Sequence, residues 1–448
     1  MNKLQPALQT SQGRSRTWSG AVLLNCFAEK ADGDKREDFA VIPSPGLTLW
    51  ATAGVGPIRG FYPLGAALYV VSGPTLFSVN SAGTATSIGA IAGTGPVSIA
   101  ANYDQLCVAA NGIGYVYSGG LLYTPVPFAV SAVFYADGYI VWVVKDSEQF
   151  TISALDNALV YDAADIASVE GFPDNIVGAI NDHREIQFFG QNSTEIFYNS
   201  GALDFPFERQ GNSFIERGCF DRDSIVKIDN TVDFVGDDRI VYTLVGYQPQ
   251  RISTHAIEYQ LRAATYARAF TYSHEGHKFY VLEVDAGTFV FDHATGAWHQ
   301  RQSFGLTWWR CNMAVNAFGA LRLGDRTTGK IYNPSPDVYT EAGEPIAFDI
   351  TLPTIEAGRE RVAMNAFEVT CETGVGNADV ADPQIILTYS DDGGHTWSNE
   401  MWRSLGAIGT YRTRAVWRGL GLFRQRQMKL RITDPVSRLV IAYWADIS

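Results

Sequence analysis

Short apolar segments separated by polar turns recur along most of the chain. In the first copy, LYVVSGPTLFSV from Leu68, two four-residue apolar segments flank a turn that contains glycine and proline. Copies of this pattern also begin at Leu106, Tyr139, Ile186, Val232, Phe279 and Leu321, and successive starts are 33 to 47 residues apart. Short apolar segments joined by such turn residues predict antiparallel hairpins.

A hairpin that returns about every 40 to 50 residues is typical of the blades of a β-propeller. Each blade alone leaves an apolar face exposed, so neighbouring blades must stack and the ring must close. We therefore expect an all-β chain that contains a β-propeller of six or seven blades. A pair of unrelated β-sandwiches is the alternative, because any all-β chain has strands at fairly regular spacing.

One segment departs from the hairpin pattern. In QRISTHAIEYQLRAA, Ser253 or Thr254 can cap a helix whose apolar positions Ile257, Leu261 and Ala264 follow the spacing i, i+4, i+7. The sequence predicts a short helix inserted between two blades.

A domain boundary is expected near 334–345, where NPSPDVYTEAGEP concentrates proline, glycine and acidic residues. Strand-like segments such as QIILTYSD and VIAYWAD follow it and predict a separate β-sandwich. We predict an N-terminal extended arm with the first strands at 1–60, the β-propeller at 61–335 and the C-terminal β-sandwich domain at 336–448.

The net charge of −13 argues against a protein that binds nucleic acid by neutralising phosphates, but it suits a surface that DNA passes without sticking. The five cysteines show no CxxC spacing and are interpreted as buried thiols from a reducing compartment. The N-terminal segment lacks the apolar core of a signal peptide, so we expect synthesis in a cytoplasm and no membrane insertion.

The segment SDDGGHTW fits the pattern SxDxGxTW, known as an Asp box. Its residues are Ser390, Asp392, Gly394, Thr396 and Trp397. In such a turn the carboxylate accepts backbone N–H bonds, a glycine takes the corner and the tryptophan packs beneath. The motif resembles the turns of sialidase-type propellers, where it is structural, so a structural turn is expected here. A glycan-binding or sialidase-like propeller is the alternative, although no arginine triad and no Tyr/Glu pair can be assigned.

Four histidines lie close together in the sequence, at His274, His277, His293 and His299. A metal site needs imidazoles that converge on one point. Residues three apart on a strand lie on opposite faces, so His274 and His277 are not expected to converge. No nucleophile elbow, phosphate-binding glycine loop or metalloprotease motif occurs. We expect no enzyme activity, no catalytic residue, no metal and no cofactor.

The most biased stretch, 403–431, is rich in arginine, contains no acidic residue and is interleaved with aromatic residues. Its candidate interface residues are Arg403, Arg412, Arg414, Arg418, Arg424 and Arg426. Arginine with aromatics suits a nucleic-acid surface or a protein interface. On an acidic chain, contact with an acidic neighbouring subunit is the favoured interpretation. A solvated edge strand, whose charge blocks aggregation, remains an alternative.

Several segments resemble the packaged-DNA stabilisation proteins of short-tailed bacteriophages, also called tail hub or head-completion proteins. They are FVGDDRIVYTLVGYQPQRISTHAIE from Phe234, STEIFYNSG from Ser193, IPSPGL from Ile42, Arg59-Gly60 followed by LYVVSG, and TYSDDGGHTWSNE followed by arginine-rich strands.

This resemblance implies a structural virion protein of the tail, made in the host cytoplasm. It implies a homo-oligomer of six copies below the portal and its adaptor protein, which retains packaged DNA and forms part of the conduit for genome ejection. The expected partners are the portal-bound adaptor, a tail needle or plug, a tailspike, and double-stranded DNA that passes through the lumen without specific binding. An interaction scaffold unrelated to phage is a further alternative.

Overall fold

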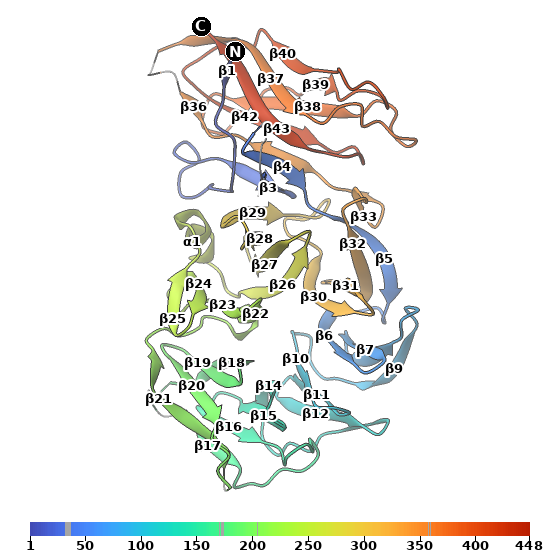
Figure 1. Cartoon of the computed structure of the whole chain (residues 1–448), viewed down its shortest axis with the longest axis vertical. Coiled ribbons are helices and arrows are strands. Elements are labelled where there is room, and N and C mark those ends of the chain that lie inside the picture. The colour runs from blue at the N-terminus through green and yellow to red at the C-terminus, as the bar shows by residue number, and fades with distance from the viewer. Residues whose placement is uncertain (32–36, 170, 172–173, 204, 357, 359) are drawn as a thin grey trace.

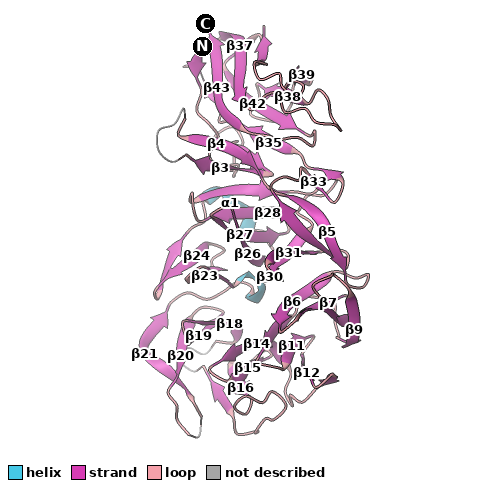
Figure 2. Cartoon of the chain, turned by 45° about the vertical axis from the view of Figure 1, so that its right-hand side comes forward, coloured by secondary structure: helices cyan, strands magenta, loops and turns pink. Residues whose placement is uncertain are grey.

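The computed structural model describes residues 1–31, 37–169, 171, 174–203, 205–356, 358 and 360–448. The chain forms two stacked parts, a propeller below and a sandwich above in the view of Figure 1, and both chain ends lie in the sandwich. Regular structure is almost entirely β-strand, with two short helices in the described part (Figure 2). None of the described helices has the length and apolar character needed to cross a bilayer.

Seven four-stranded blades surround the propeller axis in the described residues. Each predicted hairpin supplies the two middle strands of one blade, as β7 (Ala67–Ser72) and β8 (Thr75–Val79) do between β6 (Ile58–Leu64) and β9 (Ala85–Ala90). The all-β propeller predicted from the hairpins is therefore confirmed, with seven blades.

The other blades follow in chain order. The second blade is β10 (Ser98–Ala101), β11 (Leu106–Ala110), β12 (Ile113–Ser118) and β13 (Leu121–Tyr123), and the third is β14 (Val130–Ala136), β15 (Tyr139–Val144), β16 (Gln149–Ile152) and β17 (Ile166–Ser168). The fourth is β18 (Ile176–Asp182), β19 (Glu185–Gly190), β20 (Thr194–Asn199) and β21 (Phe207–Ile215). The fifth is β22 (Val226–Ile228), β23 (Thr231–Val235), β24 (Val241–Val245) and β25 (Gln248–Arg251). The sixth is β26 (Arg268–His274), β27 (His277–Val284), β28 (Gly287–Asp292) and β29 (Ala297–Arg301). The seventh is β30 (Cys311–Ala317), β31 (Ala320–Asp325), β32 (Lys330–Ser335) and β5 (Gly46–Thr52).

Buried apolar side chains fill every junction between neighbouring blades. Val71 of the first blade and Leu106 of the second share one such cluster. Leu68 of the first blade and Ile331 of the seventh share the cluster that closes the ring. Because water is excluded from both sides of each blade, the stack is stable only when the ring is complete.

Strand β5 closes the ring. It comes before the first blade in the sequence, but it forms the outer strand of the seventh blade, antiparallel to β32 from Ser335↔Gly46 to Lys330↔Thr52. The first and last parts of the propeller are thus joined by a backbone hydrogen-bond ladder, which removes the free edge that an open ring would have.

The predicted helix is present as α1 (His255–Leu261), between β25 and β26. Thr254 is its N-cap, and the Thr254 hydroxyl accepts a hydrogen bond from the backbone N–H of Ile257. Ile257 and Leu261 are buried and pack against the sixth blade. The helix therefore covers an apolar surface beside that blade.

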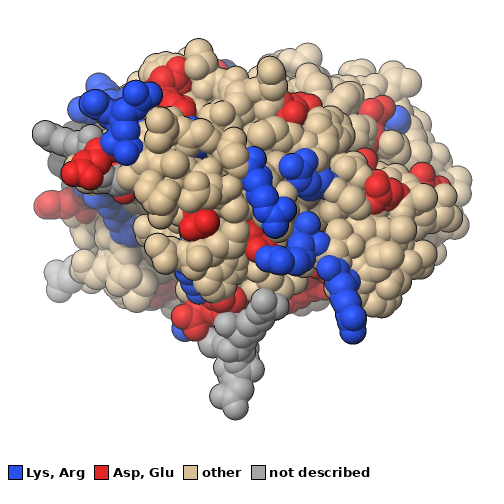
Figure 3. All heavy atoms as spheres, turned by 90° about the horizontal axis from the view of Figure 1, so that it is seen from above, with Lys and Arg blue, Asp and Glu red and all other residues tan. Residues whose placement is uncertain are grey.

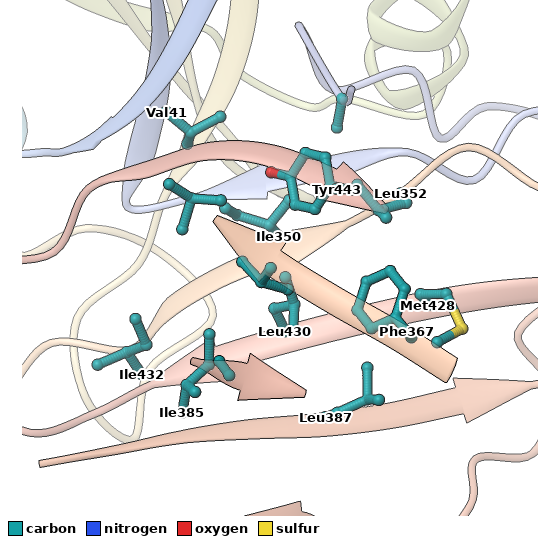
Figure 4. Close-up of a cluster of buried hydrophobic side chains, with 14 of the residues drawn as sticks. Val41, Ile350, Leu352, Phe367, Ile385, Leu387, Met428, Leu430, Ile432 and Tyr443 are labelled. Carbon is teal, nitrogen blue, oxygen red and sulfur yellow. The ribbon is translucent and has the colours of Figure 1, made fainter. Parts of the chain in front are cut away.

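The sandwich consists of two sheets. One contains β3 (Cys26–Lys30), β4 (Phe39–Pro43), β43 (Val440–Ile447), β37 (Val362–Cys371) and β40 (Ala415–Arg418), with β1 (Asn2–Lys3) and β41 (Leu422–Phe423) beside them. The other contains β2 (Val22–Leu24), β35 (Phe348–Thr351), β42 (Gln425–Ile432), β38 (Gln384–Ser390) and β39 (Met401–Ser404), with β36 (Ile355–Glu356) beside β42. Figure 4 shows side chains of both sheets, such as Phe367 and Leu387, meeting in the core.

The N-terminal segment differs from the expected arm because its strands belong to both parts. Strand β2 is parallel to β29 of the propeller through Leu24↔Gln300 and antiparallel to β35 of the sandwich. One hydrogen-bonded sheet therefore runs from a propeller blade into the sandwich. In β3, Cys26 and Ala28 lie in the sandwich core, whereas Phe27 between them packs against the propeller residue Phe279.

Asn25 holds the joint between the two parts. Its side chain is buried, and its backbone adopts a left-handed conformation with φ of 56°. Its Nδ2 donates to the carbonyls of Gln302 (3.0 Å) and Ala347 (2.9 Å), and its Oδ1 accepts from the Gln302 N–H (2.9 Å). The Asn25 N–H donates to the carbonyl of Gln300. One residue thus ties the last propeller strands to the segment that enters the sandwich.

Two buried charged residues fix the segment that links the domains, which includes β33 (Thr340–Glu341) and β34 (Glu344–Pro345). Glu341 accepts hydrogen bonds from Trp309 Nε1 (2.8 Å) and the Ser303 hydroxyl, and it pairs with Arg301. From the sandwich, Arg438 donates to the carbonyls of Ile346 (2.7 Å) and Tyr339 (2.8 Å). The linker is therefore anchored on both sides.

We expect Asn25→Ala to lower the free energy of unfolding by about 3–5 kcal/mol, because it leaves buried peptide groups at Gln302 and Ala347 without partners. Asn111→Ala is the matched control. Asn111 also has a positive φ (49°), but it is exposed and its side chain makes no hydrogen bond with the described residues. The control should cost only about 1 kcal/mol of backbone strain. Equal losses in chemical denaturation would contradict the role of the Asn25 side chain.

Candidate functional site

The predicted arginines lie in the sandwich, and five of them are exposed. Figure 3 shows this end of the molecule, where lysine and arginine side chains gather near the middle of the face. The exposed members are Arg403, Arg412, Arg414, Arg418 and Arg424. They occupy strands β39 and β40, the loop between these strands, and the single position between β41 and β42. We call this surface the arginine edge.

The arginine edge joins the edge strands of the two sheets. Arg403 on β39 donates from Nε to the carbonyl of Val416 on β40 (2.8 Å), and Trp417 Nε1 donates back to the carbonyl of Met401 (2.8 Å). Each strand lies at the end of its sheet path. Arg403 therefore has a structural role, and the pair of bonds blocks part of the exposed ladder of both strands.

Arg414 forms a two-point ion pair with Glu368 on β37, at 2.8 Å and 2.5 Å. Hydrogen bonding to Arg414 lowers the pKa of the Glu368 carboxyl, and the same pairing raises the pKa of Arg414. By contrast, Arg412, Arg418 and Arg424 make no hydrogen bond or ion pair with any described residue. These three guanidinium groups are free to meet another surface.

Large apolar side chains are exposed beside the arginines. Trp402, Ile408, Tyr411 and Leu422 leave between 51% and 77% of their surface in water. An edge that combines exposed arginine with tryptophan and tyrosine has the composition of a protein interface. A solvated edge strand would not need this exposed apolar area.

Arg426 departs from the prediction because it lies inside the sandwich with 1% of its surface exposed. It forms a two-point ion pair with Asp391 (2.7 and 2.8 Å) and donates to the carbonyl of Leu420. Its guanidinium also lies 4.0 Å from the ring centre of Tyr389 and 4.5 Å from that of Phe423. The charge is held in the core by these partners, so Arg426 cannot contact another subunit.

The four clustered histidines do not converge. His277 bonds Asp292 (2.8 Å), His293 bonds Asp233 (2.6 Å), and His299 is buried, where desolvation lowers its pKa to about 3. Within the described ranges no three metal-ligating side chains come together.

The expectation that His274 and His277 lie on opposite faces of one strand was wrong. They pair directly across the hairpin of β26 and β27, because Glu275 and Gly276 between them both have positive φ and form a two-residue turn.

Sequence reasoning missed a cavity of about 380 Å³ on the propeller axis. Its lining comes from the innermost strands of all seven blades and from the 3-10 helix η1 (Arg222–Ser224), which lies in the centre of the ring (Figure 2). Four arginines line it, namely Arg59, Arg222, Arg268 and Arg326. They are spread over 268 positions of the sequence and come from four different segments, so no local pattern brings them together.

The Asp-box segment forms a tight turn after β38. The Asp392 carboxylate accepts hydrogen bonds from the Thr396 hydroxyl (2.6 Å) and N–H (2.9 Å), from the Ser390 hydroxyl (2.7 Å) and from the His395 N–H (2.9 Å). These bonds, first those from Thr396, hold the pKa of Asp392 well below its ordinary value. Both carboxylate oxygens are used by the turn, so Asp392 is not free for catalysis.

Two further Asp-box residues lie beside the carboxylate. The Gly394 N–H donates to the Ser390 hydroxyl (2.8 Å), and Gly394 has a positive φ of 86°. Trp397 does not lie fully beneath the turn as expected, because 39% of it is exposed and Lys429 lies over its ring.

We expect the stability contributed by Asp392 to depend on pH. Because its folded pKa is depressed, the contribution is fully present above the unfolded pKa of about 3.9 and is lost as the pH falls toward the folded pKa. The difference in melting temperature between wild type and Asp392→Asn should be constant above about pH 5 and shrink below about pH 4. Asp379→Asn is the control, since the exposed Asp379 carboxylate makes no hydrogen bond with the described residues. If the difference in melting temperature between wild type and Asp392→Asn stays constant down to pH 3, the depressed pKa of Asp392 in this turn is contradicted.

Comparison with solved structures finds matches of low similarity. The WD40 propeller domain of Doa1 has 11% identity and a TM-score of 0.41, and the match covers 64% of this chain and 97% of that one. Streptogramin B lyase has 9% identity and a TM-score of 0.44, with 64% and 97% covered. The extracellular domain of BT4673 from B. thetaiotaomicron has 10% identity and a TM-score of 0.45, with 80% and 48% covered. At these values the likeness carries no functional information. No curated protein matches the chain.

Two family models match the chain, and together they cover most of it. Residues 11–339 match the model described as "Bacteriophage P22 Gp10, beta-propeller", and residues 347–447 match "Bacteriophage P22 Gp10, beta-sandwich". The order of the two models is that of the propeller and the sandwich in the structure. The chain therefore belongs to the bacteriophage P22 Gp10 family of phage stabilisation proteins, structural components of the virion.

Proposed function

We propose that this protein forms the tail hub ring below the portal and adaptor of a short-tailed phage, where it retains the packaged DNA and forms part of the conduit for its ejection. In this proposal six copies make the ring, and it contacts the adaptor, a tail needle or plug and a tailspike. The observation that carries the proposal is the arginine edge, a surface with the composition of an interface on a protein of a virion family.

The arginine edge is suited to an acidic neighbour. Arg412, Arg418 and Arg424 form no ion pair with a carboxylate in the described part of the chain, although the charge of Arg418 helps to lower the pKa of Glu368, which Arg414 already holds. The chain as a whole has a net charge of −13. A second copy, or another acidic subunit, would supply the missing carboxylates. Exposed Trp402 and Tyr411 would supply the apolar contact that makes such an interface stable.

A DNA duplex cannot pass through a single propeller. The axial cavity holds about a dozen water molecules by volume, and η1 lies in the centre of the ring. Arg222 of η1 also donates to the carbonyl of Ser131, two blades away, which ties the centre to the ring. In the proposed assembly the lumen therefore lies between copies, where net negative charge repels DNA and favours its passage without binding.

Charge reversal tests the interface. We expect the triple variant R412E/R418E/R424E to bind DNA-filled heads that lack tails at least tenfold more weakly than wild type, because it places like charges opposite an acidic partner. The control, K145E/R262E/K330E, reverses three exposed basic residues of the propeller and changes the net charge by the same amount. Binding is measured by cosedimentation, rings at the portal vertex by negative-stain imaging, and DNA retention by nuclease protection.

Each outcome separates the proposed roles. Weakened binding of the arginine-edge variant alone supports the interface. Equal weakening of both variants would show that net charge, and not this edge, controls assembly. Wild-type protein that neither binds the vertex nor protects the DNA would contradict the tail hub proposal itself.

A further inference from the structure

The axial cavity is a half-open site of mixed polar and apolar lining in the middle of the propeller. Its lining combines small residues of the innermost strands, such as Ala132 and Ala179, with the arginine side chains. The small residues make room near the axis, where the strands converge. The cavity volume of about 380 Å³ suits a small solute and not a macromolecule.

Positive charge exceeds negative charge around this cavity. Arg222 pairs with Asp223 (2.6 Å), and Arg326 pairs with Glu283 (2.8 Å). Arg59 has no carboxylate partner among the described residues; it donates to backbone carbonyls, including those of Gly95 (2.6 Å) and Gly73 (2.8 Å). It is 3% exposed, so its charge is buried without an opposite charge. Such a charge is costly unless an anion compensates it.

Arg268 is the member with free donors. It lies on β26, lines the cavity and is half-buried, and its guanidinium makes no hydrogen bond or ion pair with any described residue. Glu283, opposite it on β27, interacts with its charge at longer range and forms its ion pair with Arg326. Its position is fixed by the Tyr266 ring, 4.9 Å from the guanidinium carbon. Arg326 Nη1 likewise lacks an acceptor and is shielded from water. Two arginines at one cavity thus have unused N–H groups.

We propose that the axial cavity binds a small multivalent anion, of the phosphate or phosphate-monoester class, with Arg268 as its principal ligand. The planar guanidinium can hold two phosphate oxygens at once, which a lysine could not do with the same geometry. The excess positive charge of Arg59 would stabilise the anion through the low-dielectric interior. Bound there, the anion would bridge β26 to the strands of neighbouring blades and stabilise the ring.

Titration of the full chain with inorganic phosphate and with pyrophosphate tests the proposal. We expect one site per chain in isothermal titration calorimetry, with Kd on the order of 0.1 mM. The melting temperature should rise saturably by about 2–5 °C relative to sodium chloride of equal ionic strength. Arg268→Gln should weaken binding at least tenfold, and Arg268→Lys should weaken it less because the charge is kept. Arg424→Gln, which removes an exposed arginine of the sandwich, should bind as wild type does.

The outcomes are distinct. No saturable binding by wild type, or binding unchanged in Arg268→Gln, would overturn the proposal. If Arg268→Gln fails to fold, the weaker binding expected of Arg268→Lys carries the same test. A 5′-phosphorylated single-stranded oligonucleotide distinguishes the two possible sources of the phosphate group. If the oligonucleotide binds and needs its terminal phosphate to do so, the ligand is a nucleic-acid end. If free phosphate binds and the oligonucleotide does not, the ligand is a small solute. Equal binding of the unphosphorylated oligonucleotide would contradict a site for a terminal phosphate. The proposal is independent of the tail hub assignment, since heads are not used.

Discussion

The blades of this propeller each have two apolar faces, so the ring has no stable open form, and the strand that completes it governs the rest of the structure. That strand is β5, which pairs with β32 although some 280 residues lie between them. Most contacts within a blade are local, but the closing ladder joins the first and last strands of the propeller sequence. Loop closure over that distance costs conformational entropy, which the buried clusters on both sides of the seventh blade offset.

The closing strand also determines how the two domains meet. The chain reaches β5 through β3 and β4, which are strands of the sandwich, so ring closure and sandwich formation use one continuous segment. Strand β3 shows the consequence most clearly, because Cys26 and Ala28 face one core while Phe27 faces the other. Asn25, just before it, bonds to peptide groups on both sides of the joint. Neither domain is complete without this segment, and we expect them to unfold together.

The elements that were predicted correctly from the sequence are those whose signals lie within a few residues of each other. The seven hairpins were predicted because alternating apolar residues and turn residues lie next to each other, and α1 because its cap and apolar spacing are local. The inner and outer strands were not predicted, since segments such as ATSIGA in β9 show little alternation and depend on their neighbours for pairing. The first strands were expected in the N-terminal segment, but their pairing was not predicted, because their partners are far away in sequence. His274 and His277 were misjudged because two turn residues reverse the chain between them.

The arginines show that sequence neighbours need not share a surface, and that residues of one site can be far apart in sequence. A run of arginines in the sequence suggested one surface, but Arg426 lies within β42 and is buried, while Arg424, just before the strand, stays in water. In the propeller the reverse happens: Arg59, Arg222, Arg268 and Arg326 are distant in sequence, and only ring closure brings them to one axis. A charge cluster of this kind has no signature before the fold exists.

The joint between the domains bears on how the protein can work in a virion. A flexible linker would let the sandwich move relative to the propeller, whereas here a hydrogen-bonded sheet crosses the joint and buried Glu341 and Arg438 hold the linker. The two domains are therefore joined by backbone pairing at Leu24↔Gln300 as well as by side chains. In the tail hub ring that we propose, a stiff joint of this kind would matter, because a ring of hinged subunits would widen under load. The N-terminal segment stiffens the joint, since its strand β2 pairs with strands of both domains.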